Sequence, residues 1–152
     1  MRAVMRGEVR PMVEGDAPAV VAIGRQCPEA AAWPEDSYAR LNEAGYRGWV
    51  AVQREEVCGF LVARCAAGEA EILNLAVMPE LRRQGHARAM LRAVMDELKA
   101  EGVREVYLEV RESNAGAQAF YMGAGFGVSG RRPSYYEQPK EDAVCMVHRM
   151  AP

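Results

Sequence analysis

The chain has 152 residues, of which 50% are hydrophobic and 26% are charged, and this composition predicts one folded globular domain spanning residues 1–152. Its formal net charge of -2 argues against a nucleic-acid-binding domain, which would normally be basic. The four cysteines lack the spacing of a metal site, so we expect no metal. No apolar run approaches the ~18 residues of a membrane span, so we expect no membrane segment. Because the N-terminus has no apolar run and the cysteines are scattered, we expect a cytoplasmic protein.

The first half of the chain predicts a strand, two helices and a meander of three strands. A weak strand pattern covers Val4–Pro11. Asp16 is expected to cap a first helix, and Pro34 to open a second short helix that stops at Gly45. Three strand-like runs separated by short turns then indicate an antiparallel meander, and they cover Trp49–Gln53, Val57–Cys65 and Ala70–Met78.

The second half contains the clearest helix, Gln84–Glu101, whose apolar residues recur at helical spacing before Gly102 ends it. A strand with alternating polarity around Leu108 follows, and then a short helix that Ser113 or Asn114 caps and that runs through Ala124. Two final strands, Phe126–Arg132 and Ala143–Met150, are joined by a long polar loop. The order predicts an α/β (α+β) fold with a mixed, mostly antiparallel central sheet flanked by helices.

The segment Leu75–Arg88 joins an apolar strand to the long helix through a basic turn. Backbone N–H groups at a helix start are unpaired and carry about half a positive charge, so they suit a diphosphate. Gly85 allows close approach of the backbone, and Ala87 keeps the next contact small. The turn matches neither a Walker A loop nor the dinucleotide fingerprint, and it also fits an ordinary strand–turn–helix with solvated arginines. Those arginines are Arg82, Arg83 and Arg88.

Glu109 and Tyr121 form a second candidate constellation. Glu109 lies near the end of a predicted strand, on the face opposite Leu108 and Val110, and Tyr121 lies on the short helix that follows. A carboxylate and a phenol in one cleft can serve as general base and general acid. Taken separately, the same residues also fit a solvated strand carboxylate and a surface aromatic side chain.

Taken together, these motifs resemble those of the GCN5-related N-acetyltransferase (GNAT) superfamily. Arg82-x-x-Gly85-x-Ala87 resembles its coenzyme A pyrophosphate loop, and the run Asn114…Tyr121…Gly125-Phe126 looks like its second block. The chain is similar in particular to the bacterial ribosomal-protein alanine N-acetyltransferases. That similarity lies in Trp33-Pro34, Leu108-Glu109-Val110-Arg111, Ser113-Asn114, Arg131-Arg132, Tyr135-Tyr136, Glu141-Asp142-Ala143 and Met146.

The resemblance implies the GNAT fold and direct acetyl transfer from acetyl-CoA, as co-substrate, to an amine. Glu109 would then be the base and Tyr121 the acid, and Trp33, Tyr135 and Tyr136 would contact the acceptor. The cofactor contacts that it implies fall on Leu75, Ala76, Val77, Arg82, Arg83, Gln84, Gly85, His86, Ala87, Arg88, Asn114 and Tyr121.

The chain departs from the family pattern in three places. Gly123 and Ala124 replace bulkier residues, which is expected to widen the rim of the acetyl pocket, and the Tyr135–Glu141 loop is shorter than usual. Ala87 stands where many members have a second glycine. We expect the backbone N–H of His86 to matter and its imidazole to be solvated.

The acceptor implied by the resemblance is the N-terminal amine of a protein, most specifically a ribosomal protein that starts with alanine. Glu141 and Asp142 either face basic residues of that peptide or form a solvated turn. The alternatives are a GNAT enzyme that acetylates a small amine or a drug, an acyl-CoA-binding sensor without turnover, and an interaction module without a ligand. A monomer or weak dimer that binds neither nucleic acid nor membrane is expected.

Overall fold

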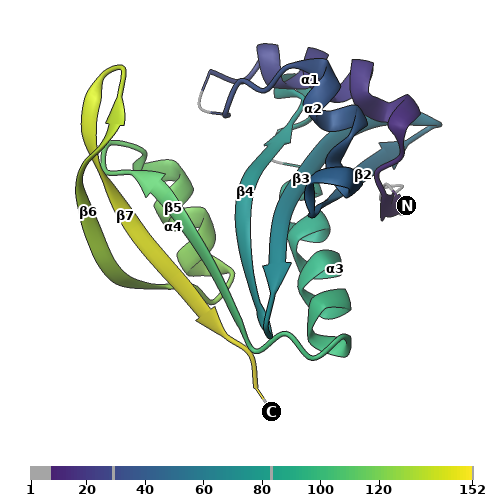
Figure 1. The fold of residues 1–152 in the computed structure, drawn as a ribbon. Helices are drawn as coiled ribbons and strands as arrows, with labels where there is room; N and C mark the ends of the chain where they lie inside the picture. The colour runs from purple at the N-terminus through teal and green to yellow at the C-terminus, as the bar shows by residue number, and fades with distance from the viewer. Residues whose placement is uncertain (1–7, 29, 83, 152) are drawn as a thin grey trace.

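The computed structural model describes residues 8–28, 30–82 and 84–151, and its central element is a seven-stranded sheet (Figure 1). The strand order is β1-β2-β3-β4-β5-β7-β6, and every neighbouring pair is antiparallel except β4 and β5, which are parallel. The prediction of a mixed, mostly antiparallel sheet is therefore confirmed. The strands are β1 (Glu8–Pro11), β2 (Tyr46–Gln53), β3 (Glu56–Ala66), β4 (Glu69–Val77), β5 (Glu105–Arg111), β6 (Gly127–Glu137) and β7 (Lys140–Arg149).

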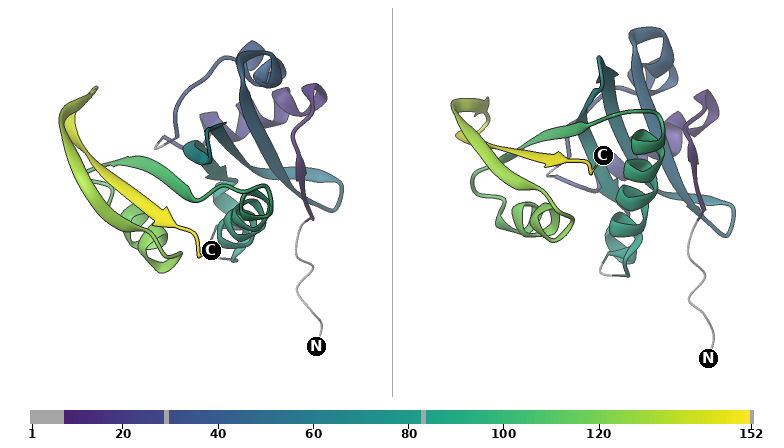
Figure 2. Two further views of the ribbon diagram at one scale, coloured as in Figure 1. Left: turned by 60° about the horizontal axis from the view of Figure 1, so that its bottom comes forward. Right: turned by 90° about the horizontal axis from the view of Figure 1, so that it is seen from below.

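The helices lie on both sides of this sheet, with α3 and α4 on one side and α1 and α2 on the other (Figure 2). The apolar stripe of α3, which includes Met90 and Leu98, packs with Leu61 of β3 in one core cluster. Val20 of α1 and Tyr38 of α2 pack on the opposite side of the sheet in a second cluster. The helices are α1 (Ala17–Arg25), α2 (Glu35–Ala39), α3 (His86–Ala100) and α4 (Ala115–Gly123), and three 3₁₀ turns are η1 (Glu14–Asp16), η2 (Leu41–Ala44) and η3 (Pro79–Leu81).

The two parallel strands in the middle of the sheet separate along their length. β4 and β5 pair only from Glu69–Glu105 to Glu71–Tyr107, although both strands continue further. Beyond that point they diverge, and β4 stays with β1–β3 while β5 leaves with β6 and β7 (Figure 1). The sheet is thereby opened at its centre, at the ends of β4 and β5 that precede α3 and α4.

A bulge interrupts β4 beside this opening. Ile72 pairs with Ala63 and Asn74 pairs with Val62, so Leu73 between them has no partner on β3. Side chains normally alternate between the faces of a strand, yet Ile72 and Leu75, three residues apart, both pack into the α3 cluster. The bulge therefore reverses the faces of β4 where it runs along the opening.

The sequence located most elements but not the last hairpin. α3 begins and ends within two residues of the predicted helix, and residues 4–7 of the predicted first strand lie outside the described residues. The long polar loop expected between the final strands is wrong, because β6 extends to Glu137 and β7 starts at Lys140. β6 is an edge strand that is exposed along nearly all of its length, so it carries no alternating apolar pattern by which a strand is recognised.

Candidate active site

Glu109 stands where β4 and β5 begin to part. On β5 the side chains of Leu108 and Val110 enter the core beneath α3 and α4, so Glu109 points to the opposite face, which we call the open face. There it lines a cavity of about 400 Å³ between the two halves of the sheet. The other lining residues are Arg64, Ala66, Glu69, Ala70, Glu71, Tyr107, Leu108, Ser129, Arg132, Cys145 and Met146.

The Glu109 carboxylate is surrounded by four residues of the last hairpin. Its Oε2 forms an ion pair with Nε of Arg132 and lies 3.9 Å from Sγ of Cys145, and the side chain is 13% exposed. Hydrogen bonding with Glu109 raises the pKa of Tyr135. Burial, followed by the charge of Glu109, raises the pKa of Tyr136 to about 12. Glu109 is therefore a partly shielded carboxylate in a polar cavity, not a solvated strand residue.

Tyr121 lies on α4 and is buried, with 7% of its surface exposed. Its ring meets those of Phe120 and Phe126 edge-on, with centroids 5.1 and 5.5 Å away. Desolvation by this burial raises the pKa of the Tyr121 phenol well above its usual value. The side chain belongs to the core cluster on the helix side of β5 and does not line the cavity of Glu109. Tyr121 is therefore not a surface aromatic side chain. That Tyr121 and Glu109 act as acid and base on one substrate stays a prediction.

Asn114 holds the start of α4. Its Oδ1 accepts a hydrogen bond from the backbone N–H of Ala117 at 3.0 Å, which is an N-cap interaction. Of the two residues proposed as the cap, the structure selects Asn114 over Ser113. Asn114 remains half-buried at the helix start, and its Nδ2 donates no hydrogen bond to any of the residues that the structure describes.

The turn between β4 and α3 presents a helix start to solvent. Gly85 has φ +83 and is the N-cap of α3, and a Cβ at this position would meet nothing within 4 Å. The left-handed backbone, rather than lack of space, therefore requires glycine. The first N–H groups of α3, beginning with His86 and Ala87, have no carbonyl one turn earlier to bond. Gln84 is exposed beside them, and Arg83 lies outside the described residues.

This turn follows Leu75, Ala76 and Val77, whose side chains pack in the two core clusters. Their backbone groups on the β5 side face the part of the opening where β5 is no longer paired with β4. Val77 is also tied to α1, because its carbonyl accepts a hydrogen bond from Sγ of Cys27 at 3.5 Å. The same sulfur accepts a hydrogen bond from Nη2 of Arg82 at 3.2 Å, so Cys27 links the strand end to the turn.

Two expectations about this region are wrong. The imidazole of His86 is not solvated but buried, and its Nε2 has no hydrogen-bond partner among the described residues. His86 is the first inward position of α3, four residues before the buried Met90. Gly123 does not widen the rim of the acetyl pocket, because the guanidinium of Arg88 fills the space beside it. Nη2 of Arg88 lies 3.0 Å from the position that a Cβ on residue 123 would occupy, and Nη1 of Arg88 donates to the Gly123 carbonyl at 3.3 Å.

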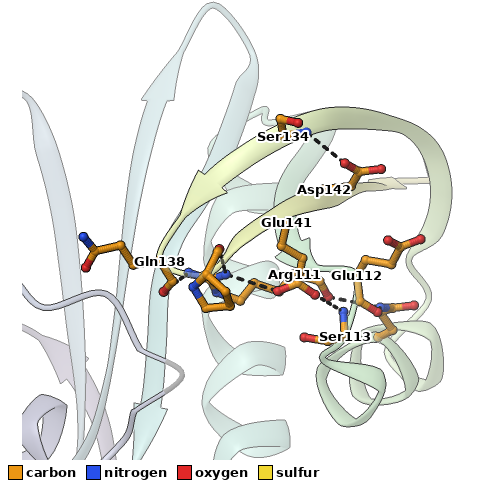
Figure 3. Close-up of polar contacts among 9 residues, drawn as sticks. Arg111, Glu112, Ser113, Ser134, Gln138, Glu141 and Asp142 are labelled. Atoms are coloured by element: carbon orange, nitrogen blue, oxygen red, sulfur yellow. Dashed lines mark hydrogen bonds and ion pairs between the residues drawn. The ribbon is translucent and has the colours of Figure 1, made fainter.

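The two acidic residues of the last hairpin are used inside the protein (Figure 3). Glu141 forms an ion pair with Arg111 at 3.1 Å and accepts a hydrogen bond from the backbone N–H of Ser113 at 2.5 Å. Asp142 accepts one from the backbone N–H of Ser134 at 2.8 Å. Hydrogen bonding from Ser113 lowers the pKa of Glu141. Neither of the two expected roles holds, since the Glu141 carboxylate fastens the hairpin to the end of β5 and the Asp142 carboxylate bonds within the hairpin.

The three predicted acceptor residues fall into two places. Tyr135 and Tyr136 lie on the hairpin with ring centroids 5.0 Å apart, and the Arg132 guanidinium lies 5.7 Å from the Tyr135 ring, so both adjoin Glu109. Trp33 stacks on Tyr38 at 5.5 Å and lines a different cavity, of about 550 Å³, next to α2. The two cavities have no lining residue in common.

The sequence reasoning gave no role to Asn74. This buried amide exchanges two hydrogen bonds with the backbone of Ala31 and donates a third to Tyr38 Oη, at 3.1–3.3 Å. It anchors the bulged part of β4 to the segment before α2. Its signal was available, because Asn74 is the one polar residue in the apolar run from Ile72 to Met78.

The described residues contain no cluster of three or more His, Cys, Asp or Glu side chains suited to a metal ion. Within the same residues, no helix combines the length and the apolar character needed to cross a membrane.

A sheet that parts at its centre, a glycine-capped helix start beside the gap and a carboxylate facing it are features of one class of enzyme. Residues 18–126 match the model of the acetyltransferase (GNAT) family, and the chain belongs to this family. It is thus an acyltransferase with a GNAT fold.

Among individual relatives, the chain is similar to the [ribosomal protein bS18]-alanine N-acetyltransferase of Escherichia coli strain K12. The two are 36% identical over 117 residues, which are 76% of this chain and 79% of the relative. The crystal structure of the ribosomal-protein-S18-alanine N-acetyltransferase from Escherichia coli superimposes with a TM-score of 0.85 at 32% identity, covering 96% of each chain. Arabidopsis thaliana NAA60 in complex with acetyl-CoA shares the fold, with a TM-score of 0.84 at 22% identity over 94% of this chain and 98% of that one.

Proposed function

We propose that this protein transfers the acetyl group of acetyl-CoA to the N-terminal α-amine of a protein, specifically a ribosomal protein that begins with alanine. The observation that carries the proposal is the position of Glu109, a shielded carboxylate at the point where β4 and β5 part. The similarity to alanine N-acetyltransferases over three quarters of the chain supports the choice of acceptor. The proposal includes a cytoplasmic location and one catalytic domain.

The residues around the opening fit acetyl-CoA. Its pantetheine arm contains amide groups, which would pair with the backbone of Leu75–Val77 where β5 has left β4. Its diphosphate would be held by the N–H groups at the start of α3 and by the nearby arginines. Asn114 stands at the start of α4 as a further donor. When bound, acetyl-CoA supplies the activated acetyl group, and this chain supplies its orientation.

Proton transfer from the acceptor would be the task of Glu109. An α-amine with a pKa near ~8 is largely protonated at neutral pH and cannot attack a carbonyl carbon. Glu109, directly or through a water molecule, would accept this proton inside the cavity on the open face. Its 13% exposure limits competition from bulk solvent.

The departing thiolate of coenzyme A needs a proton or a strong hydrogen bond. Tyr121 would provide it from the helix side of β5, opposite to the face from which the acceptor arrives. A tyrosine phenol is protonated at neutral pH, and burial raises the pKa of Tyr121 further, so this phenol can donate a hydrogen bond to the thiolate. Glu109 would thus act on the acceptor from one face of the sheet, and Tyr121 would act on the leaving group from the other.

The acceptor is expected to enter over the open face, where Tyr135 and Tyr136 adjoin Glu109. Trp33 lines another cavity, so its contribution to acceptor binding would be limited to peptide residues beyond the first. The carboxylates of Glu141 and Asp142 bond to groups of the protein itself and are not part of the proposed peptide contact.

The test is an acetylation assay with acetyl-CoA and four acceptor classes: peptides beginning with alanine, peptides with an internal lysine, polyamines and aminoglycosides. Mass spectrometry of the alanine peptides should show one added acetyl group at the α-amine, and Glu109→Gln should reduce this rate about a hundredfold or more. Glu112→Gln is the control, since its carboxylate lies three residues away and pairs with Arg131. Preference for a polyamine or a drug would refute the acceptor, and acetyl-CoA binding without turnover would indicate a sensor.

A further inference from the structure

An arginine covers the carboxylate that the proposed reaction needs. Arg132 extends from β6, and its guanidinium forms an ion pair with Oε2 of Glu109, the residue that would receive the acceptor's proton. The Arg132 side chain is 64% exposed, whereas that of Glu109 is 13% exposed. Among the described residues no other cation pairs with Glu109. The candidate base is therefore occupied by a charge of the protein itself.

The acceptor brings a second cation to the same oxygen. A protonated α-amine carries one positive charge and N–H donors, and the Arg132 guanidinium already presents both to Glu109. Two cations within a few Å of one carboxylate repel each other, and the carboxylate cannot serve both at full strength. The amine and the guanidinium therefore compete for Glu109, and pairing with the amine weakens the pairing with the guanidinium.

The surroundings of Arg132 permit the guanidinium to leave Glu109. Its exposed side chain lies on an edge strand, where a new rotamer disturbs no core packing. The ring of Tyr135, with its centroid 5.7 Å from the guanidinium, offers a cation–π contact that does not depend on Glu109. Arg132 makes this contact while it is paired with Glu109, so the guanidinium keeps one partner if it leaves the carboxylate.

We propose that Arg132 is a positioning residue that competes with the acceptor's ammonium group for Glu109. Without an acceptor the guanidinium holds the carboxylate directed into the cavity, and a bound acceptor displaces the guanidinium from Glu109 while its contact with the Tyr135 ring remains. This inference rests on the proposed function of Glu109 as the base. It implies selectivity for cationic amines, because an uncharged amine is a poorer competitor for the carboxylate.

Arg131 provides a matched control in the next position of the chain. Its guanidinium points to the other face of β6, where it pairs with Glu112 and with Asp142. Its side chain is 51% exposed, so Arg131→Ala removes the same charge and a similar surface without touching Glu109.

The experiment compares the wild type, Arg132→Ala, Arg132→Lys and Arg131→Ala in steady-state assays with acetyl-CoA and an alanine-starting peptide. Removing the competitor should lower the peptide KM of Arg132→Ala by about two- to fivefold, the range expected for a partly exposed ion pair, and leave the acetyl-CoA KM unchanged. Arg132→Lys should restore part of the wild-type value, and Arg131→Ala should match the wild type. Calorimetric titration of the peptide into the protein saturated with coenzyme A should give the same order of Kd values without turnover.

A peptide KM that rises in Arg132→Ala would overturn the proposal, because the arginine would then hold the acceptor rather than oppose it. An equal fall in Arg131→Ala would overturn it too, since the effect would be one of net charge. Glu109→Gln in both backgrounds separates this failure from that of the proposed function. If Glu109→Gln keeps full turnover, Glu109 is not the base and the proposed function fails. If Glu109→Gln loses turnover while Arg132→Ala leaves the peptide KM unchanged, only the proposed competition fails.

Discussion

Gly125, which follows α4, is the position where an added methyl group should cost the most for its size. Its φ of +100 lies in the left-handed region, where a Cβ costs about 1–2 kcal/mol. A Cβ there would also lie 2.7 Å from Cε1 and Nδ1 of His148, so the ring has to move. Moving it breaks the hydrogen bond of 2.9 Å between Nδ1 and the Gly125 carbonyl, which is worth about 0.5–1.5 kcal/mol. Gly125→Ala is therefore expected to lower the free energy of unfolding by about 1.5–3.5 kcal/mol.

Gly102→Ala isolates the backbone part of this cost. Gly102 has a similar φ of +92, but a Cβ there meets nothing within 4 Å, so the expected loss is about 1–2 kcal/mol. Urea denaturation of both variants measures the difference. In a His148→Ala background the excess loss at Gly125 should disappear, because the obstacle is gone. Equal losses in the wild-type background, or an excess that survives removal of His148, would refute the steric argument.

Three further substitutions probe the site. Tyr121→Phe should lower turnover about a hundredfold with little change in the KM of the peptide, and wild-type turnover would remove Tyr121 from the mechanism. Cys27→Ala should raise the acetyl-CoA KM about two- to fivefold by removing the hydrogen bond that Arg82 donates to the Cys27 sulfur, whereas Cys58→Ala, an equal loss of buried volume elsewhere, should not. The pKa of Glu141 is lowered in the folded state, so the ionised form of Glu141 stabilises the fold. This stabilisation should be complete above about pH 4.3 and vanish on acidification. The unfolding free energies of wild type and Glu141→Gln should therefore converge at low pH.

Local patterns in the sequence were enough for the elements next to the site. The apolar spacing from Met90 to Leu98 identifies the face of α3 that packs on the sheet, and the alternation around Leu108 places Glu109 on the opposite face of β5. The glycine at the start of α3 was singled out for the close approach that it allows, and the structure adds its φ of +83 as a further reason for glycine. In each case the relevant contacts lie within one turn or one strand, where periodicity carries the information.

What the sequence did not reveal depends on contacts between distant segments. The pairing of Arg132 with Glu109 joins residues of β6 and β5 that come together only in the folded sheet. His86 was expected in solvent because histidine is polar, but its helix position turns it inward. The separation of β4 from β5 has no local signal, since both strands carry ordinary strand patterns up to their ends.

The opening in the sheet persists because each of its edges is tied to a different neighbour. Two parallel strands that stop pairing forgo backbone hydrogen bonds worth about 0.5–1.5 kcal/mol each, so something must keep them from closing. On the β4 side, the buried amide of Asn74 holds the bulged strand to Ala31 and Tyr38. On the β5 side, Arg111 and Glu141 hold the strand end to the last hairpin (Figure 3). The gap and the position of Glu109 beside it are therefore built into the folded chain before any thioester or amine binds.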